Sequence, residues 1–283
     1  MAWVAIIWLI DYTRWQSGAN SAYSKQKRYD MNDENPYKPP ESEIADVYAS
    51  SDAGGTLEKG VSGEYDFEIM DVIKESWERT NGIKSAYWVG LLIFMLIVFG
   101  VALLMGGFGL FGAQAGILGQ MLPNLLFTAI TYPFLAGIIM MGVHRAVDLP
   151  VFAGQVFNSL GFVLPVIIAS MLVSVFTTIG FMLLVLPGIY LSVAYFLVMP
   201  LIVEKQLGAW DAMETSRKAI TKRWFKVFGL FIVMGAIVVV SMFSIIGLFW
   251  TLPMSTVMLG VLYRIIFGVE AARGKEVSGT IAA

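Results

Sequence analysis

The sequence predicts an all-α integral membrane protein with about six transmembrane helices, and two observations carry that prediction. Hydrophobic residues make up 57% of the 283 positions and charged residues only 14%, whereas about 25% of an ordinary soluble domain is charged. In addition, three long stretches contain no Asp, Glu, Lys, Arg or His. Such a chain has too little polar surface to cover itself in water, so the composition argues against a soluble enzyme.

The three charge-free stretches define the candidate spans. They cover residues 85–143, 149–203 and 227–263. A spanning helix needs roughly 20 apolar residues, so the first two stretches hold two spans each. The third is barely long enough for two spans with a tight turn near residues 244–247, and one long tilted helix is the alternative that would give five spans. The predicted limits are 86–105, 121–143, 161–182, 184–203, 227–244 and 248–267.

The distribution of Lys and Arg predicts the orientation of these spans. Basic residues lie in the segments between the hairpins, and the three hairpin turns contain none. The positive-inside rule therefore places every charged segment, both termini included, in the cytoplasm. We expect a tail over residues 1–68, a six-span transmembrane domain over 69–268 and a short cytoplasmic C-terminal tail over 269–283.

The predicted N-terminal tail is polar and acidic. From Asp11 to Glu68 there are 12 acidic and 6 basic residues, and a segment of this composition is expected to be mostly disordered. Its Pro-rich run at 35–40 favours extended backbone, which suits either a docking peptide for a protein partner or a solvated tether. The apolar start, residues 1–10, has half the length of a span, and both an interfacial anchor and a mis-set start codon remain open.

A stretch with helical apolar spacing precedes each hairpin. The apolar positions are Ile69, Ile73 and Trp77 in the first stretch, Phe152, Val156 and Leu160 in the second, and Leu207, Trp210, Met213, Ile220 and Trp224 in the third. This spacing predicts three amphipathic helices lying in the cytoplasmic interface. The chain would then be built from three copies of one unit, an interfacial helix followed by a hairpin.

Basic residues cluster in and after the third of these stretches. They are Arg217, Lys218, Lys222, Arg223 and Lys226. An anionic leaflet attracts each basic residue near its surface by about 1 kcal/mol, so we expect these side chains to contact lipid headgroups. The predicted partner is the lipid bilayer, in particular its anionic lipid, and no feature favours nucleic acid.

Hydroxyl and amide side chains in the spans form a candidate polar path. Ser170, Ser174 and Thr177 share one face of the third predicted span, and Asn124 lies in the second. One interpretation is the wall of a path for a substrate. The other, which we favour, is helix packing with the hydroxyls bonded to carbonyls of their own helix.

Ionisable groups are nearly absent from the predicted spans, which argues against a proton relay, a voltage sensor or a metal transporter. Arg264 near the inner end of the last span is the exception, and we expect its long side chain to snorkel to the interface. His144, Arg145 and Asp148 cluster at the inner end of the second span and are interpreted as an interfacial polar cap, because no nucleophile lies near them in sequence. The sequence predicts no catalytic residue, metal ligand or cofactor.

Two segments resemble a known family. Residues 187–228, with a Pro-Gly opening, the run PLIV and the pattern GAWDAMETSRK, and residues 247–268, GLFWTLPMSTVMLGVLYRIIFG, are similar to the YciC-type uncharacterised bacterial inner-membrane proteins. Tails with an Asn-Pro-Tyr-x-x-Pro segment like residues 35–40 occur in these proteins as well. The resemblance implies a multi-pass protein of the bacterial inner membrane without an established activity, and therefore no catalytic residues.

These observations favour a non-enzymatic protein of the inner membrane. It would organise the envelope or act as a scaffold, with interfacial helices on anionic lipid and the tail available to a protein partner. The alternative is a transporter or permease for a small or apolar solute that works without charged residues in the membrane.

Overall fold

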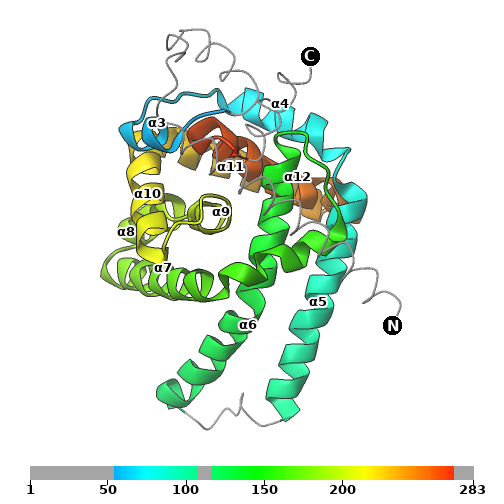
Figure 1. Ribbon diagram of the computed structural model, residues 1–283, viewed down its shortest axis with the longest axis vertical. Coiled ribbons are helices and arrows are strands. Elements are labelled where there is room, and N and C mark those ends of the chain that lie inside the picture. Colours follow the sequence, from blue (N-terminus) through cyan, green and yellow to red (C-terminus); the bar gives the residue numbers. More distant parts are fainter. Residues whose placement is uncertain (1–53, 108–115, 271–283) are drawn as a thin grey trace, which may run out of the picture. The chain divides into compact units, whose positions relative to one another are not determined.

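The computed structural model describes residues 54–107 and 116–270, and all regular structure within these residues is helical (Figure 1). The elements are α3 (Leu57–Ser62), α4 (Ile69–Thr80), α5 (Lys84–Gly107), α6 (Gly116–Arg145), the 3-10 helix η1 (Ala153–Phe162), α7 (Val163–Leu183), α8 (Val185–Ala194), α9 (Val198–Glu204), α10 (Ala209–Lys222), α11 (Trp224–Met242) and α12 (Ile245–Phe267).

Six helical stretches in the described residues are long and apolar enough to cross a membrane. They are Lys84–Gly107, Leu126–Arg145, Ala153–Leu183, Val185–Glu204, Trp224–Met242 and Ile246–Phe267. Each overlaps one predicted span. The prediction of an all-α protein with six candidate spans is therefore confirmed over the alternative of five, because α11 and α12 are separate helices joined by a short turn at residues 243–244.

Prolines decide where three of the helices begin. Pro165, Pro187 and Pro200 each occupy the third position of a helix, in α7, α8 and α9 respectively. A proline has no N–H to donate, and its ring clashes with an α-helical carbonyl four residues earlier. The predicted fourth span, 184–203, is therefore two helices that meet at a break over residues 195–197, four residues before Pro200.

The second predicted interfacial helix differs from the expected one. Its residues form the 3-10 helix η1, which continues directly into α7. Phe152 and Leu160 are exposed whereas Val156 is fully buried, so the predicted stripe is not one face. The reason is the period, since a 3-10 helix repeats every three residues and the predicted stripe assumed nearly four.

The last part of the predicted tail, residues 54–68, is folded in the structure. Residues 54–68 are ordered and include α3, which begins with a bond from the Lys59 N–H to the Thr56 hydroxyl (3.1 Å) and ends at Gly63 in the left-handed region (φ 87°). The following residues are held by two aromatic side chains, Tyr65 and Phe67, both buried. The sequence analysis missed this folded segment because it is acidic and its few apolar residues are well separated in sequence.

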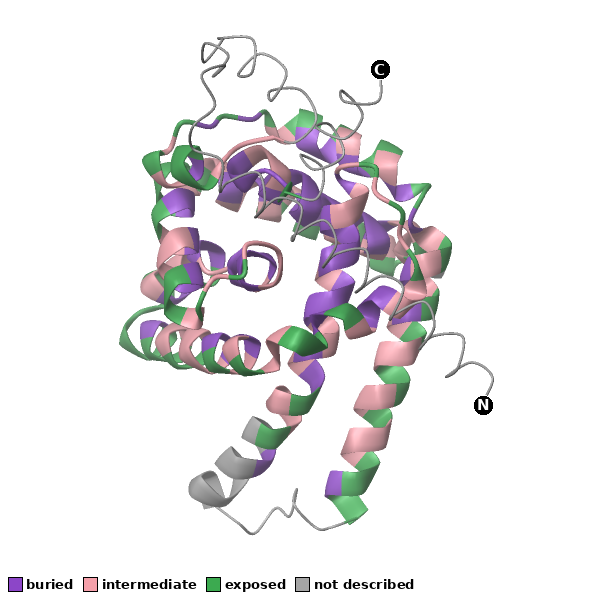
Figure 2. Cartoon of the chain, viewed as in Figure 1, coloured by how far each residue is buried: buried purple, intermediate pink, exposed green. Residues whose placement is uncertain are grey.

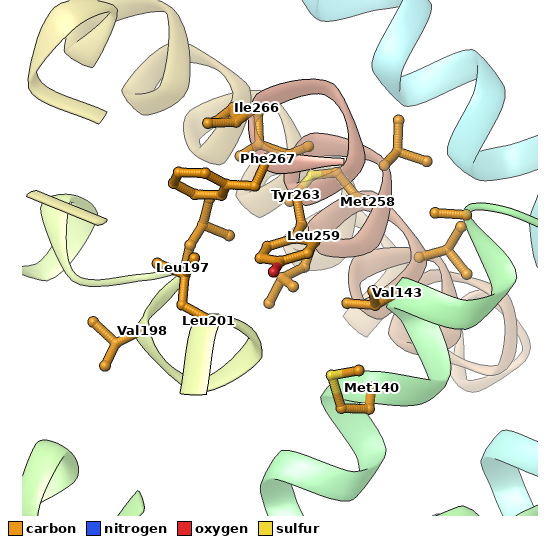
Figure 3. Packing of buried hydrophobic residues seen from close by; sticks show 14 of the residues in the cluster. Met140, Val143, Leu197, Val198, Leu201, Met258, Leu259, Tyr263, Ile266 and Phe267 are labelled. Atoms are coloured by element: carbon orange, nitrogen blue, oxygen red, sulfur yellow. The ribbon is translucent and has the colours of Figure 1, made fainter. Parts of the chain in front are cut away.

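The buried core lies where α6, α9 and α12 meet (Figure 3). Leu197 and Leu201 face Tyr263 and Phe267 of α12 there, and all four are fully buried. Of these three helices, α6 and α12 cross each other at glycines. An ideal Cβ at Gly142 would lie 2.0 Å from the Thr256 carbonyl oxygen, and one at Gly260 would lie 2.1 Å from that of Gly142. Only glycine permits so close an approach of two backbones.

Burial is uneven among the six candidate spans (Figure 2). Half or more of the most apolar part of α6 and α12 is buried, whereas the corresponding share of α5 is 11%. Large apolar side chains such as Leu92, Phe99 and Leu103 are exposed along α5. Exposed apolar surface of this extent is typical of a helix that contacts lipid.

Candidate functional site

Two of the five predicted lipid-contacting residues are bound within α10. The Arg217 guanidinium donates two hydrogen bonds to Glu214, at 2.8 and 3.0 Å, and the Lys218 ammonium lies 3.4 Å from the same carboxylate. The hydrogen bond from Arg217 lowers the pKa of Glu214, and the same contact raises the pKa of Arg217. Glu214 therefore offsets one of these two positive charges and holds both side chains on the surface of α10.

A third basic residue, Lys226, is bound to the segment before α4. Its ammonium lies 2.7 Å from Asp66 and 3.7 Å from Glu68, and it also donates to the Phe67 carbonyl oxygen at 3.2 Å. Hydrogen bonds from Lys226 and from the Phe67 N–H lower the pKa of Asp66. The sequence analysis missed this contact because it assigned residues 54–68 to the tail.

The remaining two, Lys222 and Arg223, are exposed, and within the described part of the chain neither side chain forms an ion pair. Aromatic residues follow them directly. Phe225 is 83% exposed, and Trp224 donates from its ring N–H to the Tyr190 carbonyl oxygen at 3.3 Å. The surface formed by residues 222–225, named here the basic-aromatic corner, combines two outward charges with an outward apolar ring.

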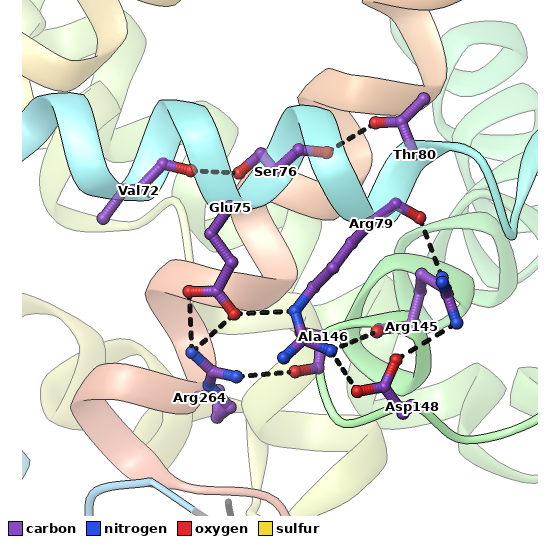
Figure 4. A network of polar contacts seen from close by, with 9 residues as sticks. All are labelled: Val72, Glu75, Ser76, Arg79, Thr80, Arg145, Ala146, Asp148 and Arg264. Carbon is purple, nitrogen blue, oxygen red and sulfur yellow. Dashed lines mark hydrogen bonds and ion pairs between the residues drawn. The ribbon is translucent and has the colours of Figure 1, made fainter.

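A larger ionic cluster joins α4 to the ends of α6 and α12 (Figure 4). Glu75 binds Arg79 at 2.6 Å and Arg264 at 2.8 Å, and Arg79 binds Asp148 at 2.5 Å. Arg145 completes the cluster by binding Asp148 at 3.2 Å and donating to the Arg79 carbonyl oxygen at 2.8 Å. Burial and two carboxylate partners act on Arg79 in opposite directions, and its pKa is raised overall.

Arg264, the ionisable exception in the last predicted span, is held in this cluster. Its side chain is only 14% exposed, pairs with Glu75 and donates to the Ala146 carbonyl oxygen at 2.9 Å. The predicted polar cap at the end of α6 is split. Arg145 and Asp148 belong to the ionic cluster, whereas His144 contacts the Gln155 side chain at 3.1 Å.

A second buried ionic group fixes the C-terminal end of α12. Glu204 accepts hydrogen bonds from the Tyr263 hydroxyl at 2.8 Å and from the Glu270 N–H at 2.6 Å, and pairs with Lys205 at 3.2 Å. The side chains of Glu204 and Lys205 are nearly fully buried. Sequence reasoning missed this group because its members lie about 60 residues apart on the ends of different helices.

The residues of the candidate polar path point in different directions. Ser170 is buried and donates to the Ile167 carbonyl oxygen of its own helix at 2.9 Å, whereas Ser174 is exposed. The Thr177 hydroxyl is buried and has no partner among the described residues, and the Asn124 side chain lies outside the described part. An open cavity of about 390 Å³ lies elsewhere, and its lining is Trp77, Ile237, Ser241, Ser244, Ile246, Gly247, Trp250 and Thr251.

Comparisons with known proteins give no match: no family model matches the chain, and no curated protein or solved structure is significantly similar to it. The resemblance of residues 187–228 and 247–268 to YciC-type proteins stays a prediction.

Proposed function

We propose that this protein is a non-enzymatic component of the bacterial inner membrane that binds anionic lipid and serves as a scaffold of the envelope. The observation that carries the proposal is the basic-aromatic corner, where Lys222 and Arg223 are exposed beside the outward ring of Phe225. The segment before residue 54 would be available to a protein partner.

The chemistry of the corner suits the headgroup region of a bilayer. Two basic side chains near an anionic leaflet gain about 1 kcal/mol each. Aromatic rings such as Trp224 and Phe225 favour the boundary between headgroups and acyl chains. The positive-inside rule assigns this surface to the cytoplasmic leaflet. The binding set is smaller than the five residues suggested by the sequence, because carboxylates already occupy Arg217, Lys218 and Lys226.

Transport of a solute has less support. A polar path requires the hydroxyls of α7 to line one channel, and Ser170 and Ser174 lie in different surroundings, one buried and one exposed. The ion pairs of Glu75 with Arg264 and of Glu204 with Lys205 lie where helices meet and fix the positions of those helices.

The proposal is tested by titrating the purified protein in an uncharged detergent with phosphatidylglycerol or phosphatidylcholine and recording the midpoint of heat denaturation. Phosphatidylglycerol should raise the midpoint more than phosphatidylcholine, since only the anionic lipid binds the corner. The double variant Lys222→Gln/Arg223→Gln should lose most of this difference.

The matched control is the double variant Arg217→Gln/Lys218→Gln, which removes the same number of positive charges from side chains that Glu214 already binds. It should keep the preference for phosphatidylglycerol. An equal loss in both double variants, or no preference in the unmodified protein, would refute the proposed site.

A further inference from the structure

A charged helix lies along the α11–α12 hairpin. At the start of α4, Ile69 lies against Gly229 of α11, where an ideal Cβ would be 3.0 Å from the Ile69 Cδ1. Eight residues later, about 12 Å along the helix, Trp77 lines one cavity together with Ile237 and Ser241. α4 therefore follows α11 almost to its end. Asp71, Lys74 and Glu78 are exposed on this same helix.

The turn of the α11–α12 hairpin also meets the charged end of the α5–α6 hairpin. The Lys84 ammonium lies 4.3 Å from the centre of the Trp250 ring, and the Trp88 ring stacks on Phe249 with centroids 5.1 Å apart. Lys84 is the first residue of α5 and Arg145 the last of α6. The turn between α11 and α12 is therefore close to the level at which α5 begins and α6 ends.

The opposite end of α12 contacts the same end of the α5–α6 hairpin. Arg264 donates to the carbonyl oxygen of Ala146, one residue beyond α6. α12 thus touches the charged end of α5–α6 near both of its own termini. Figure 1 shows the rest of α5 and α6 extending away from the other helices. If α5 and α6 cross the membrane, α12 lies across their ends and does not cross with them.

The α7–α8 hairpin carries a charged helix in the same manner. The Trp210 ring at the start of α10 contacts Phe176 of α7 with centroids 6.3 Å apart. Near the end of α10, the Thr221 hydroxyl is 2.7 Å from that of Tyr190 of α8. Both α7 and α8 contacts lie within eight residues of the turn at Leu184, about 12 Å along a helix. Charged residues of α10 are consequently held near the turn of this hairpin.

Both turns expose large apolar side chains, and Ser244 adds one exposed hydroxyl to the second turn. Met182 is 83% exposed and Phe243 is 91% exposed, and Leu183, Leu184, Leu186 and Ile246 are exposed as well. A turn that emerges into water on the far side of a membrane normally carries polar residues, and exposed apolar surface of this kind calls for an apolar partner. The acyl chains of a bilayer are such a partner.

We propose that α7–α8 and α11–α12 do not cross the bilayer but lie within the leaflet on the side of α4 and α10, while α5–α6 crosses. Their exposed apolar faces would contact the acyl chains of one leaflet. The alternative, in which both hairpins cross, would draw exposed charges such as Lys74, Glu78 and Lys218 into the hydrocarbon, where they are costly. The inference does not depend on which lipid the basic-aromatic corner binds.

The absence of cysteine from the chain permits a direct test with single-cysteine variants. Leu184→Cys and Phe243→Cys mark the two turns, Ala115→Cys marks the connection between α5 and α6, and Glu78→Cys marks the charged face of α4. Each purified variant is labelled with the fluorophore NBD in detergent and reconstituted into liposomes. Dithionite, which does not cross the bilayer, is then added outside.

The labels on Ala115→Cys and Glu78→Cys should be reduced in the fraction of molecules whose marked face points outward. The labels on the two turns should be reduced several-fold less, and fully once detergent dissolves the liposomes. They should also be quenched by lipids brominated in the acyl chain, because the exposed apolar side chains of both turns contact these chains. If both turns are reduced to the same extent as the Ala115→Cys label, the hairpins cross and the inference is wrong.

Discussion

The helices α4 and α10 both have one buried and one charged face, but they use their charges differently. On α4, Glu75 and Arg79 pair with Arg264 and Asp148, which belong to other elements. On α10, Arg217 and Lys218 pair with Glu214 of the same helix. The charges of α4 thus join distant parts of the chain, whereas those of α10 contribute little to its attachment.

α10 is held instead by hydroxyl groups and apolar contacts. The buried Ser216 donates to the Ala194 carbonyl oxygen of α8 at 2.7 Å, and the Tyr65 hydroxyl donates to the Ala219 carbonyl oxygen at 2.9 Å. Attachment without charge leaves Lys222 and Arg223 available at the end of the helix. The comparison teaches that an amphipathic pattern does not tell whether the charges of a helix serve packing or recognition.

The largest expected effect comes from replacing a carboxylate of the ionic cluster. Glu75→Gln would leave Arg264, a side chain that is 14% exposed, without its counter-charge. Removing one partner of a buried pair is strongly destabilising, and for this partly exposed pair we expect a loss of about 2–3 kcal/mol. The free energy of unfolding can be measured by denaturant titration in mixed micelles.

Two controls sharpen this prediction. Glu78→Gln removes an exposed charge from the same helix, and Glu214→Gln makes the same change in an ion pair within α10. Each variant should lower the free energy of unfolding by less than about 1 kcal/mol, because exposed charges and exposed ion pairs contribute little to stability. A loss of similar size in the Glu75 and Glu214 variants would remove the distinction between the two helices.

A smaller effect is expected from the buried serines. Ser216→Ala removes a bond between α10 and α8, and we expect a loss of about 1–2 kcal/mol because the Ala194 carbonyl loses a buried donor. Ser76→Ala on α4 removes a bond to the Val72 carbonyl oxygen of its own helix. That change should cost less, since the helix backbone already supplies a donor to this carbonyl. Equal losses in the same titration would show that Ser216 does not attach α10.

The smallest effect at neutral pH, about 0.5–1.5 kcal/mol, is expected for Tyr65→Phe. Burial raises the pKa of Tyr65 from 10.0 to about 12, so the folded protein holds this proton more tightly than the unfolded chain. The resulting stability is complete below pH 10 and is lost as the pH rises toward 12. The difference in denaturation midpoint between the unmodified protein and the variant should therefore shrink above pH 10. A constant difference between pH 8 and 11 would contradict the burial of this hydroxyl.

The fold class and the six apolar segments could be predicted from the sequence. A long stretch without charged residues is expected to contact lipid or the protein core, because burying an unpaired charge is costly. The break within the predicted fourth span was not predicted from the sequence. The break at residues 195–197 arises from Pro200, and a backbone rule applied to that proline would have found it. Order in residues 54–68 could not be predicted, because it depends on Tyr65 and on Lys226, a partner about 160 residues away.

The candidate site was predicted only in outline. The five basic residues were recognisable as a cluster, and Glu214 stands three and four residues before Arg217 and Lys218, a spacing that signals pairing within a helix. The contact of Lys226 with Asp66 gave no such local signal. The contact of Arg264 with Glu75 gave no local signal either, because Glu75 lies on α4, 189 residues earlier in the chain.

The position of Arg264 near the end of the chain has a consequence for biosynthesis. Glu75 and Arg264 are 189 residues apart, and at about 5–20 residues per second a ribosome needs on the order of 10–40 s to make the second after the first. During that interval α4 and α6 have been synthesised, but Arg264, which contacts Glu75 of α4 and Ala146 after α6, has not. A nascent chain that stops before α12 would leave Glu75 paired with Arg79 alone, and would lack the ion pair that joins α4 to α12.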